Sequence, residues 1–281
     1  MRRHKLVTGL LVFCTFFFCL TKNRNSIPYN AYYLQEINLS KGNEKAVYFP
    51  KIAVLDSGIQ NSVYHNQNIV FNNTVERKQH SSHGLSTFSI IGCSEYNNLG
   101  LACCSDIYIF DVEGKDNIAS IQEVESALYC CCEYGIDIVN ISLGIKNDSG
   151  LIRAAIDRCI SKGIIVVASS GNSGTDSLLY PAAYGNVIAV SGIDKECNVW
   201  KKANFNSSCF LLPCLDIICL DECENGIVIN EKSGTSFSAP IMTSIISLYE
   251  RKYGKVTEGE MKDRLTQSYE ENIFNCEKFL N

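Results

Sequence analysis

Short, unbroken apolar runs recur along the chain and are separated by stretches in which apolar residues return at helical spacing. Four of the runs are rich in Val and Ile, with few polar residues inside them. They are Lys51–Asp56, Ile136–Leu143, Gly163–Ser169 and Asn186–Ser191. This composition is typical of strands buried on both faces of a parallel sheet.

The stretches between these runs predict helices. Ile121–Tyr134 and Leu151–Lys162 carry apolar residues on one helical face, and Gly163 is expected to form the C-cap of the second helix. Strands that alternate with helices predict an α/β fold with a doubly wound, mostly parallel sheet and helices on both faces. In such folds the chemistry gathers at the carboxyl ends of the strands.

The N-terminal residues have a different pattern. A basic head is followed by the apolar stretch Leu6–Leu20, which is short for a membrane span of about 20 residues. Residues 1–21 are therefore predicted to be a secretory signal peptide or an N-terminal anchor. Either would place the protein outside the cytoplasm, secreted or tethered to a membrane. A short buried helix is the alternative.

Composition narrows the choice of partners. The 281 residues carry a formal net charge of −5 without a basic stripe, so nucleic acid is not expected as a partner. Thirteen of the 15 cysteines lie beyond the leader, and an odd number cannot all pair within one chain. Cys209, Cys214, Cys219 and Cys223 lack zinc-site spacing, so we expect small buried residues there, with one or two disulfides left open.

Candidate chemistry begins with Ser233–Pro240 (SGTSFSAP), which precedes an apolar stretch with the spacing of a buried helix. Pro240 is expected in the first turn of that helix. Ser236 would then lie at the helix start, where backbone amides stabilise an oxyanion. A serine hydroxyl needs a base, and His83 is the histidine that leads into an apolar helix. Asp56, at the end of a strand, is the candidate to orient it.

Four segments together resemble the subtilisin family of serine proteases. They are Ala53–Gly58 (AVLDSG), Ser82–Gly84 (SHG), Ala168–Asn172 (ASSGN) and Gly234–Pro240 (GTSFSAP). The resemblance extends over about residues 26–252 and implies a peptidase domain, taken as 22–281, without a sizeable propeptide. It implies a serine endopeptidase with Asp56, His83 and Ser236 as the triad and Asn172 as the oxyanion donor. A role in peptide maturation is a further analogy.

The resemblance also implies the residues that hold the substrate. Ser142, Leu143 and Gly144 would line one side of the first specificity pocket, and Ala168, Ser169 and Ser170 the other. Leu179, before Tyr180–Pro181, is expected to fill part of this pocket and favour small or medium side chains. Asp176 would favour basic side chains if it pointed inward.

Several features depart from the family pattern. Leu85–Ser86 stand where Thr-His is usual, and Cys219–Asp221 are taken as the replacement for the usual Ala-Pro-Gly. Gly92–Cys104 is shorter than the family's calcium loop, so no cofactor is expected and a structural calcium ion is left open. The chain is expected to act as a monomer on a peptide or protein substrate.

Three other functions compete with a serine endopeptidase. Asp148-Ser-Gly150 repeats Asp56-Ser-Gly58, as an aspartic protease would require, but it reads as a turn. A cysteine-dependent hydrolase would need a cysteine at a strand-to-helix turn with polar support. A peptide-binding protein of the same fold, weak or inert as a catalyst, remains the alternative from a different class.

Overall fold

The computed structural model describes residues 46–59, 69–72, 81–92, 100–102, 105–114, 118–224, 226–270 and 273–280. The expected leader, 1–21, lies outside these residues, as do His65, His80 and most of the segment compared with the calcium loop. Among the described residues, no helix has the length and apolar character needed to cross a membrane.

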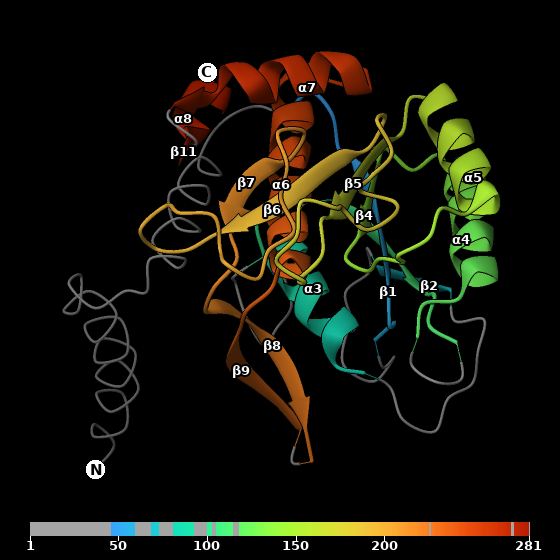
Figure 1. The fold of residues 1–281 in the computed structure, drawn as a ribbon. Helices are drawn as coiled ribbons and strands as arrows, with labels where there is room; N and C mark the ends of the chain where they lie inside the picture. The colour runs from blue at the N-terminus through green and yellow to red at the C-terminus, as the bar shows by residue number, and fades with distance from the viewer. Residues whose placement is uncertain are drawn as a thin grey trace, which may run out of the picture.

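A seven-stranded sheet forms the centre of the molecule (Figure 1). Its order is β2-β3-β1-β4-β5-β6-β7, and each pair of neighbours is parallel. The strands are β1 (Lys51–Asp56), β2 (Ile69–Asn72), β3 (Asp106–Asp111), β4 (Ile138–Ile141), β5 (Ile165–Ser169), β6 (Ile188–Ile193) and β7 (Phe210–Pro213). Every residue of β4, β5 and β6 is buried, which explains their unbroken apolar sequences. The four predicted strands are confirmed, and each of their ends lies within two residues of the predicted position.

Helices cover both faces of this sheet, as predicted. Side chains of β1 alternate between two cores. Ile52 and Val54 pack with α3 (His83–Ile91) and α6 (Thr235–Tyr253). Ala53 and Leu55 pack with α4 (Ile121–Tyr134) and α5 (Gly150–Ser161). The remaining helices, α7 (Glu258–Gln267) and α8 (Cys276–Leu280), lie near the end of α6 and join the first core (Figure 1).

Local capping explains why the helix predictions were accurate. Ser120 caps α4 by accepting a hydrogen bond from Glu123 N at 3.4 Å, and Gly135 ends the helix with a left-handed φ of 63°. Ser149 caps α5 in the same way, through Ile152 N. Gly163, with a φ of 77°, follows α5 as expected.

The prediction for Pro240 was wrong. Helix α6 begins at Thr235, so Pro240 lies in the second turn rather than the first. A proline there has no N–H to offer the Ser236 carbonyl one turn earlier. Ser142 Oγ donates to that carbonyl instead, at 2.8 Å. The loop after β4 is thereby tied to the residue expected to be the nucleophile.

Two antiparallel pairs supplement the main sheet. The larger is a hairpin of β8 (Ile217–Cys223) and β9 (Gly226–Lys232), which projects from the body of the molecule beside α3 (Figure 1). The smaller joins β10 (Tyr269–Glu270) to β11 (Ile273–Phe274) near the C-terminus. Neither pair was predicted from the sequence.

Candidate active site

The four expected catalytic residues come from separate elements at the carboxyl edge of the sheet. Asp56 is the last residue of β1, His83 the first of α3 and Ser236 the second of α6, while Asn172 follows β5. Asp56 and Ser236 are buried, and the His83 side chain keeps 33% of its exposure. The imidazole is therefore accessible to solvent while the carboxylate beside it is not.

Asp56 holds His83 through the ring nitrogen Nδ1. The distance from Nδ1 to Asp56 Oδ1 is 2.8 Å, and the same oxygen accepts from Ser57 N at 2.8 Å. Thr87 Oγ1, one turn into α3, donates to Asp56 Oδ2 at 3.2 Å. With its proton on Nδ1, the imidazole has Nε2 available as a proton acceptor. The carboxylate thus has donors on both oxygens and a fixed orientation.

The electrostatics of His83 combine opposing effects. Burial lowers the pKa of His83, but the charge of Asp56 and its hydrogen bond outweigh this, so the pKa is raised above its ordinary value. Lys232 lowers it and Glu113 raises it, both by charge alone. The raised pKa of His83 is therefore set by the burial of its ring and by three charged neighbours.

Asn172 and Ser236 lie on either side of Gly234. Asn172 Oδ1 accepts from Thr235 N at 2.9 Å, which occupies the amide oxygen and leaves the Nδ2 hydrogens as its donors. A Cβ on Gly234 would lie 3.3 Å from Ser236 Oγ and 3.4 Å from Asn172 Nδ2. This glycine also has a positive φ of 152°. The hydroxyl of Ser236 and the amide donor of Asn172 therefore both approach the backbone of Gly234 closely, where a side chain would crowd them.

The ring of His83 lies close to the start of α6. Its centroid is 5.5 Å from that of Phe237, the residue after Ser236. Because α3 and α6 pack in the same core, they bring the histidine and the serine segments to one end of the molecule. Asp56, His83, Asn172 and Ser236 therefore share the carboxyl edge of the sheet, as the sequence predicted.

The segments expected to bind substrate end the neighbouring strands β4 and β5. Ser142, Leu143 and Gly144 follow β4, while Ala168 and Ser169 end β5 and Ser170 comes next. Leu179 lies against both segments and donates its N–H to Ser170 O at 3.0 Å. A Cβ on Gly144 would lie 2.7 Å from Leu179 Cβ, and one on Gly171 only 2.8 Å from Leu179 Cγ.

Leu179 consequently occupies the space between Gly144 and Gly171. Asp176, in the same loop, is exposed, and its Oδ1 accepts a hydrogen bond from Ser177 Oγ at 3.4 Å. Among the described residues, no group of three or more His, Cys, Asp or Glu side chains is arranged to hold a metal ion.

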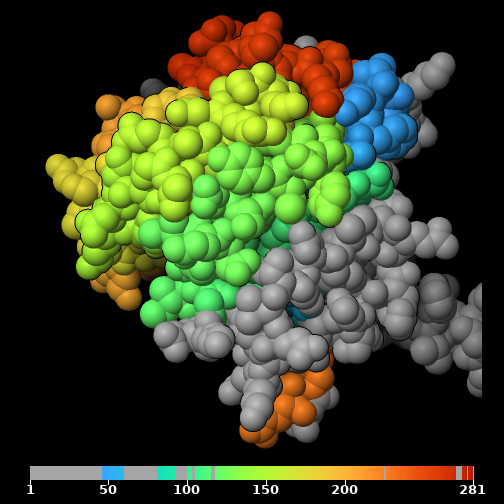
Figure 2. Space-filling model, turned by 90° about the vertical axis from the view of Figure 1, so that its right-hand side faces the viewer, coloured from blue at the N-terminus to red at the C-terminus, as the bar shows by residue number. Residues whose placement is uncertain are grey.

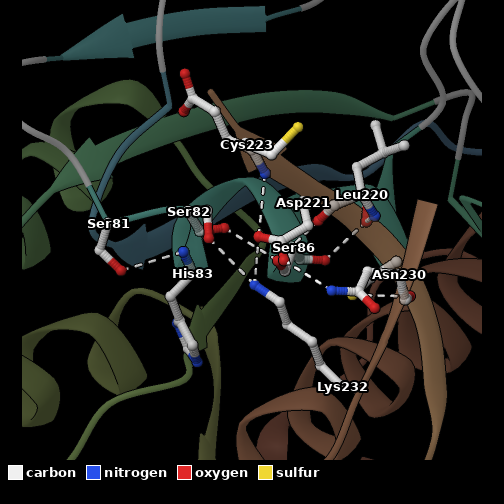
Figure 3. A network of polar contacts seen from close by, with 12 residues as sticks. Ser81, Ser82, His83, Ser86, Leu220, Asp221, Cys223, Asn230 and Lys232 are labelled. Atoms are coloured by element: carbon white, nitrogen blue, oxygen red, sulfur yellow. Dashed lines mark hydrogen bonds and ion pairs between the residues drawn. The ribbon is translucent and has the colours of Figure 1, made fainter. Parts of the chain in front are cut away.

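The β8–β9 hairpin is docked on the helix that carries His83 (Figure 3). Ser86 Oγ donates to Leu220 O at 2.7 Å, and Leu220 N donates to Ser89 Oγ at 2.9 Å. Lys232 Nζ lies 2.6 Å from Asp221 Oδ1 and 3.1 Å from Ser82 Oγ, next to His83. This arrangement gives Ser86, which departs from the family pattern, a structural role.

The Lys232–Asp221 ion pair is largely buried, with 22% and 17% of the side chains exposed. Burial raises the pKa of Asp221, but donors from Lys232, Ser82 and Asn230 outweigh it and lower the pKa to about 2. Sequence reasoning missed this pair, and it missed Thr87 and Thr235 as well. Thr87 had one signal, since it stands one turn after His83 in a predicted helix.

Cys219–Asp221, taken as the replacement for Ala-Pro-Gly, lie inside β8, in paired extended backbone. Asp216 has a left-handed φ of 52° at the turn between β7 and β8. Gly234 N donates to Cys214 O at 2.8 Å, so Cys214–Leu215–Asp216 is the segment that supports the serine loop.

Comparison with known proteins places this site in a family. Residues 50–277 match the model of the subtilase family, Peptidase_S8. Subtilisin BL of Lederbergia lenta is 28% identical over 214 residues, which cover 72% of this chain and 76% of that protein. M-protease of Shouchella clausii strain KSM-K16 is also 28% identical over 72% of this chain, but over only 54% of its own length.

Solved structures agree on the fold. The prenylagaramide maturation protease PagA matches with a TM-score of 0.71 and 23% identity, over 88% of this chain and 96% of its own. The self-cleaved protease domain of PatA matches with a TM-score of 0.70 and 23% identity, over 82% of this chain and 95% of that domain. The chain therefore belongs to the subtilase family and is a serine endopeptidase, as the resemblance implied.

Proposed function

We propose that Ser236 is the nucleophile of this endopeptidase, His83 its general base, Asp56 the residue that orients the histidine, and Asn172 the oxyanion donor. The observation that carries the proposal is the pairing of His83 Nδ1 with Asp56 Oδ1 at 2.8 Å, at the same edge of the sheet as the N-terminus of α6. This pairing holds the imidazole in the tautomer in which Nε2 accepts a proton.

The reaction follows from these positions. Nε2 of His83 takes the Ser236 proton as Oγ attacks the substrate carbonyl, and Asp56 stabilises the resulting imidazolium. The negative carbonyl oxygen receives hydrogen bonds from Asn172 Nδ2 and from the backbone at the start of α6. His83 then gives its proton to the leaving amine, and water releases the acyl group by the same steps in reverse.

A serine-directed fluorophosphonate tests this assignment directly. We expect it to label the protein once, and peptide mapping by mass spectrometry to place the label on Ser236. Labelling should weaken at acidic pH, because the raised pKa of His83 leaves the base protonated there. A label on another serine, or a reaction independent of pH, would remove Ser236 from its proposed role.

The substrate is proposed to be a dedicated peptide or a loop of a protein precursor. The support is that PagA and PatA, which share this fold, are described as maturation proteases. Residues 1–21, outside the described part of the chain, are proposed to direct the protein out of the cytoplasm. A cleavage profile on a peptide library, compared with cleavage of a denatured general protein substrate, separates a dedicated protease from a degradative one.

Leu179 is proposed to restrict the residue before the cut to small or medium side chains. Each methylene excluded from the pocket loses about 0.8 kcal/mol of burial. In matched peptides we expect higher kcat/KM for Ala or Leu than for Phe. Leu179→Gly should raise kcat/KM for the Phe peptide by roughly 10- to 100-fold, whereas Leu151→Ala, an exposed control on α5, should not. A wild-type preference for Phe would contradict the steric role of Leu179. A preference for Arg that is lost in Asp176→Asn would show instead that the charge of Asp176 determines the specificity.

Lys232 is proposed to set the pH range of the reaction. Its positive charge lowers the pKa of His83, so Lys232→Met should raise that pKa and move the acidic limb of kcat/KM to higher pH. Lys262→Met, at a salt bridge on α7, should leave the limb in place. The measurement is kcat/KM from pH 5 to 9 at low salt. An unmoved acidic limb in Lys232→Met would exclude an electrostatic role for this residue.

A further inference from the structure

Two cysteines meet where α4 and α5 pack together, on the face of the sheet that Figure 2 shows in green and yellow-green. Cys132 lies in the last turn of α4 and Cys159 in the last turn of α5. Their sulfur atoms are 3.6 Å apart, although the residues are separated by 27 positions in sequence. Cys159 is fully buried, while Cys132 is partly exposed.

The neighbouring cysteines make other contacts. Cys131, next to Cys132 on α4, is buried in the same core as Cys159. The cysteines for which the sequence left a disulfide open make different contacts: Cys214 Sγ donates to Ile193 O, Cys219 Sγ to Asn230 O and Cys223 Sγ to Gly226 O. Cys159 Sγ also donates to a carbonyl, that of Leu128 at 3.5 Å, but in addition it lies 3.6 Å from Cys132 Sγ. A disulfide needs its sulfurs about 2.05 Å apart, so the two side chains would have to turn toward each other to form one.

We propose that Cys132 and Cys159 form a redox-controlled disulfide that clasps α4 to α5. In an oxidising compartment, the Cys132 thiolate attacks a low-molecular-weight disulfide such as oxidised glutathione, and one glutathione thiolate leaves. The Cys159 thiolate then attacks the Cys132 sulfur of this mixed disulfide and expels the second glutathione. The two cysteines lose two electrons and two protons, and the oxidant is reduced to two thiols.

Exposure sets the order of these steps. Cys132 reaches solvent and meets the oxidant first, whereas burial raises the pKa of Cys159, which must lose its proton to solvent before it attacks the mixed disulfide. Once the bond exists, the buried partner shields it from reductants. Both oxidation and reduction of the pair are therefore expected to be slow, with the attack by Cys159 as the slow step of oxidation.

The clasp lies far from the chemistry. Helices α4 and α5 run antiparallel to the strands they connect, so their last turns lie at the amino edge of the sheet, opposite Asp56 and Ser236. The bond should leave kcat/KM nearly unchanged. It closes a loop of about 28 residues, which constrains the unfolded chain and should raise the Tm by about 5–10 °C.

The experiment compares the full chain equilibrated in oxidised and in reduced glutathione buffer. We expect peptide mapping under non-reducing conditions to find Cys132 linked to Cys159 only after oxidation, with a mass lower by two hydrogens. The oxidised form should have the higher Tm. Cys132→Ser should lose this redox-dependent difference, while Cys130→Ser, the adjacent control, should keep it.

Two outcomes would overturn the proposal. One is that alkylating reagents label both Cys132 and Cys159 after oxidation, or that Cys132 is found linked to another cysteine. The other is a Cys132–Cys159 bond that leaves the Tm unchanged. Mapping needs no catalytic activity, so it gives an answer even where a variant folds poorly.

Discussion

Ser236→Ala is expected to lower kcat by about a million-fold and to abolish labelling by a serine-directed phosphonate. Losses of this size follow removal of the triad serine or histidine in subtilisin, a member of the same family. The physical reason is that the variant has no nucleophile at the start of α6, so only substrate binding and the oxyanion donors still assist attack by water. The measurement is kcat on a cleaved peptide, with the phosphonate as an independent readout.

The controls distinguish a lost nucleophile from a damaged fold. Ser233→Ala removes an exposed hydroxyl three residues earlier, which contacts Asp216, and should keep near wild-type kcat. His83→Ala should lose about as much as Ser236→Ala, and the double variant should lose no more, because the two residues act as a unit. If Ser236→Ala cleaved peptides at the wild-type rate, another residue would have to be the nucleophile.

The elements that were predictable carry their signals locally. The limits of β1 and α4 were predicted to the residue, because a buried strand is an unbroken apolar run and α4 has its own cap at each end. The catalytic candidates were predictable for a related reason. Asp56 and Ser236 stand where a strand ends and a helix begins, and parallel strands bring such positions to one edge.

The β8–β9 hairpin was not predictable, because its support is not local. Its burial depends on hydrogen bonds between Leu220 and the α3 serines, which lie 131 and 134 positions away in sequence. Without that contact, Ile217–Cys223 has no clean alternation of apolar and polar residues. The Lys232–Asp221 pair depends on the register of the same hairpin, and so its position beside His83 had no signal in the sequence.

Pro240 shows how a correct motif can still lead to a wrong boundary. The rule that proline belongs in the first turn of a helix assumes that the freed carbonyl has no other donor. Here Ser142 Oγ, from a loop 94 positions earlier, supplies that donor to Ser236 O. The helix therefore starts five residues before Pro240, and Ser236 lies in its first turn.

Asp56→Asn is expected to lower kcat by about 10,000-fold without unfolding the protein. Asp56 Oδ1 accepts from both His83 Nδ1 and Ser57 N, and the negative charge of the carboxylate favours the proton on Nδ1. An asparagine can turn its NH₂ group toward Nδ1, which would place the imidazole proton on Nε2. That nitrogen then faces Ser236 as a donor and cannot act as a base.

The pH profile separates this effect from a structural one. The negative charge of Asp56 raises the pKa of His83, so the residual activity of Asp56→Asn should titrate at lower pH than that of the wild type. Asp106 is the exposed first residue of β3, at the edge of the sheet opposite Asp56. Asp106→Asn should therefore change neither kcat nor the pH profile. Thr87→Val leaves the charge in place but removes a donor to Oδ2, and we expect a loss below tenfold. An Asp56→Asn enzyme that kept kcat within tenfold of the wild type would show that His83 does not depend on this carboxylate for its tautomer.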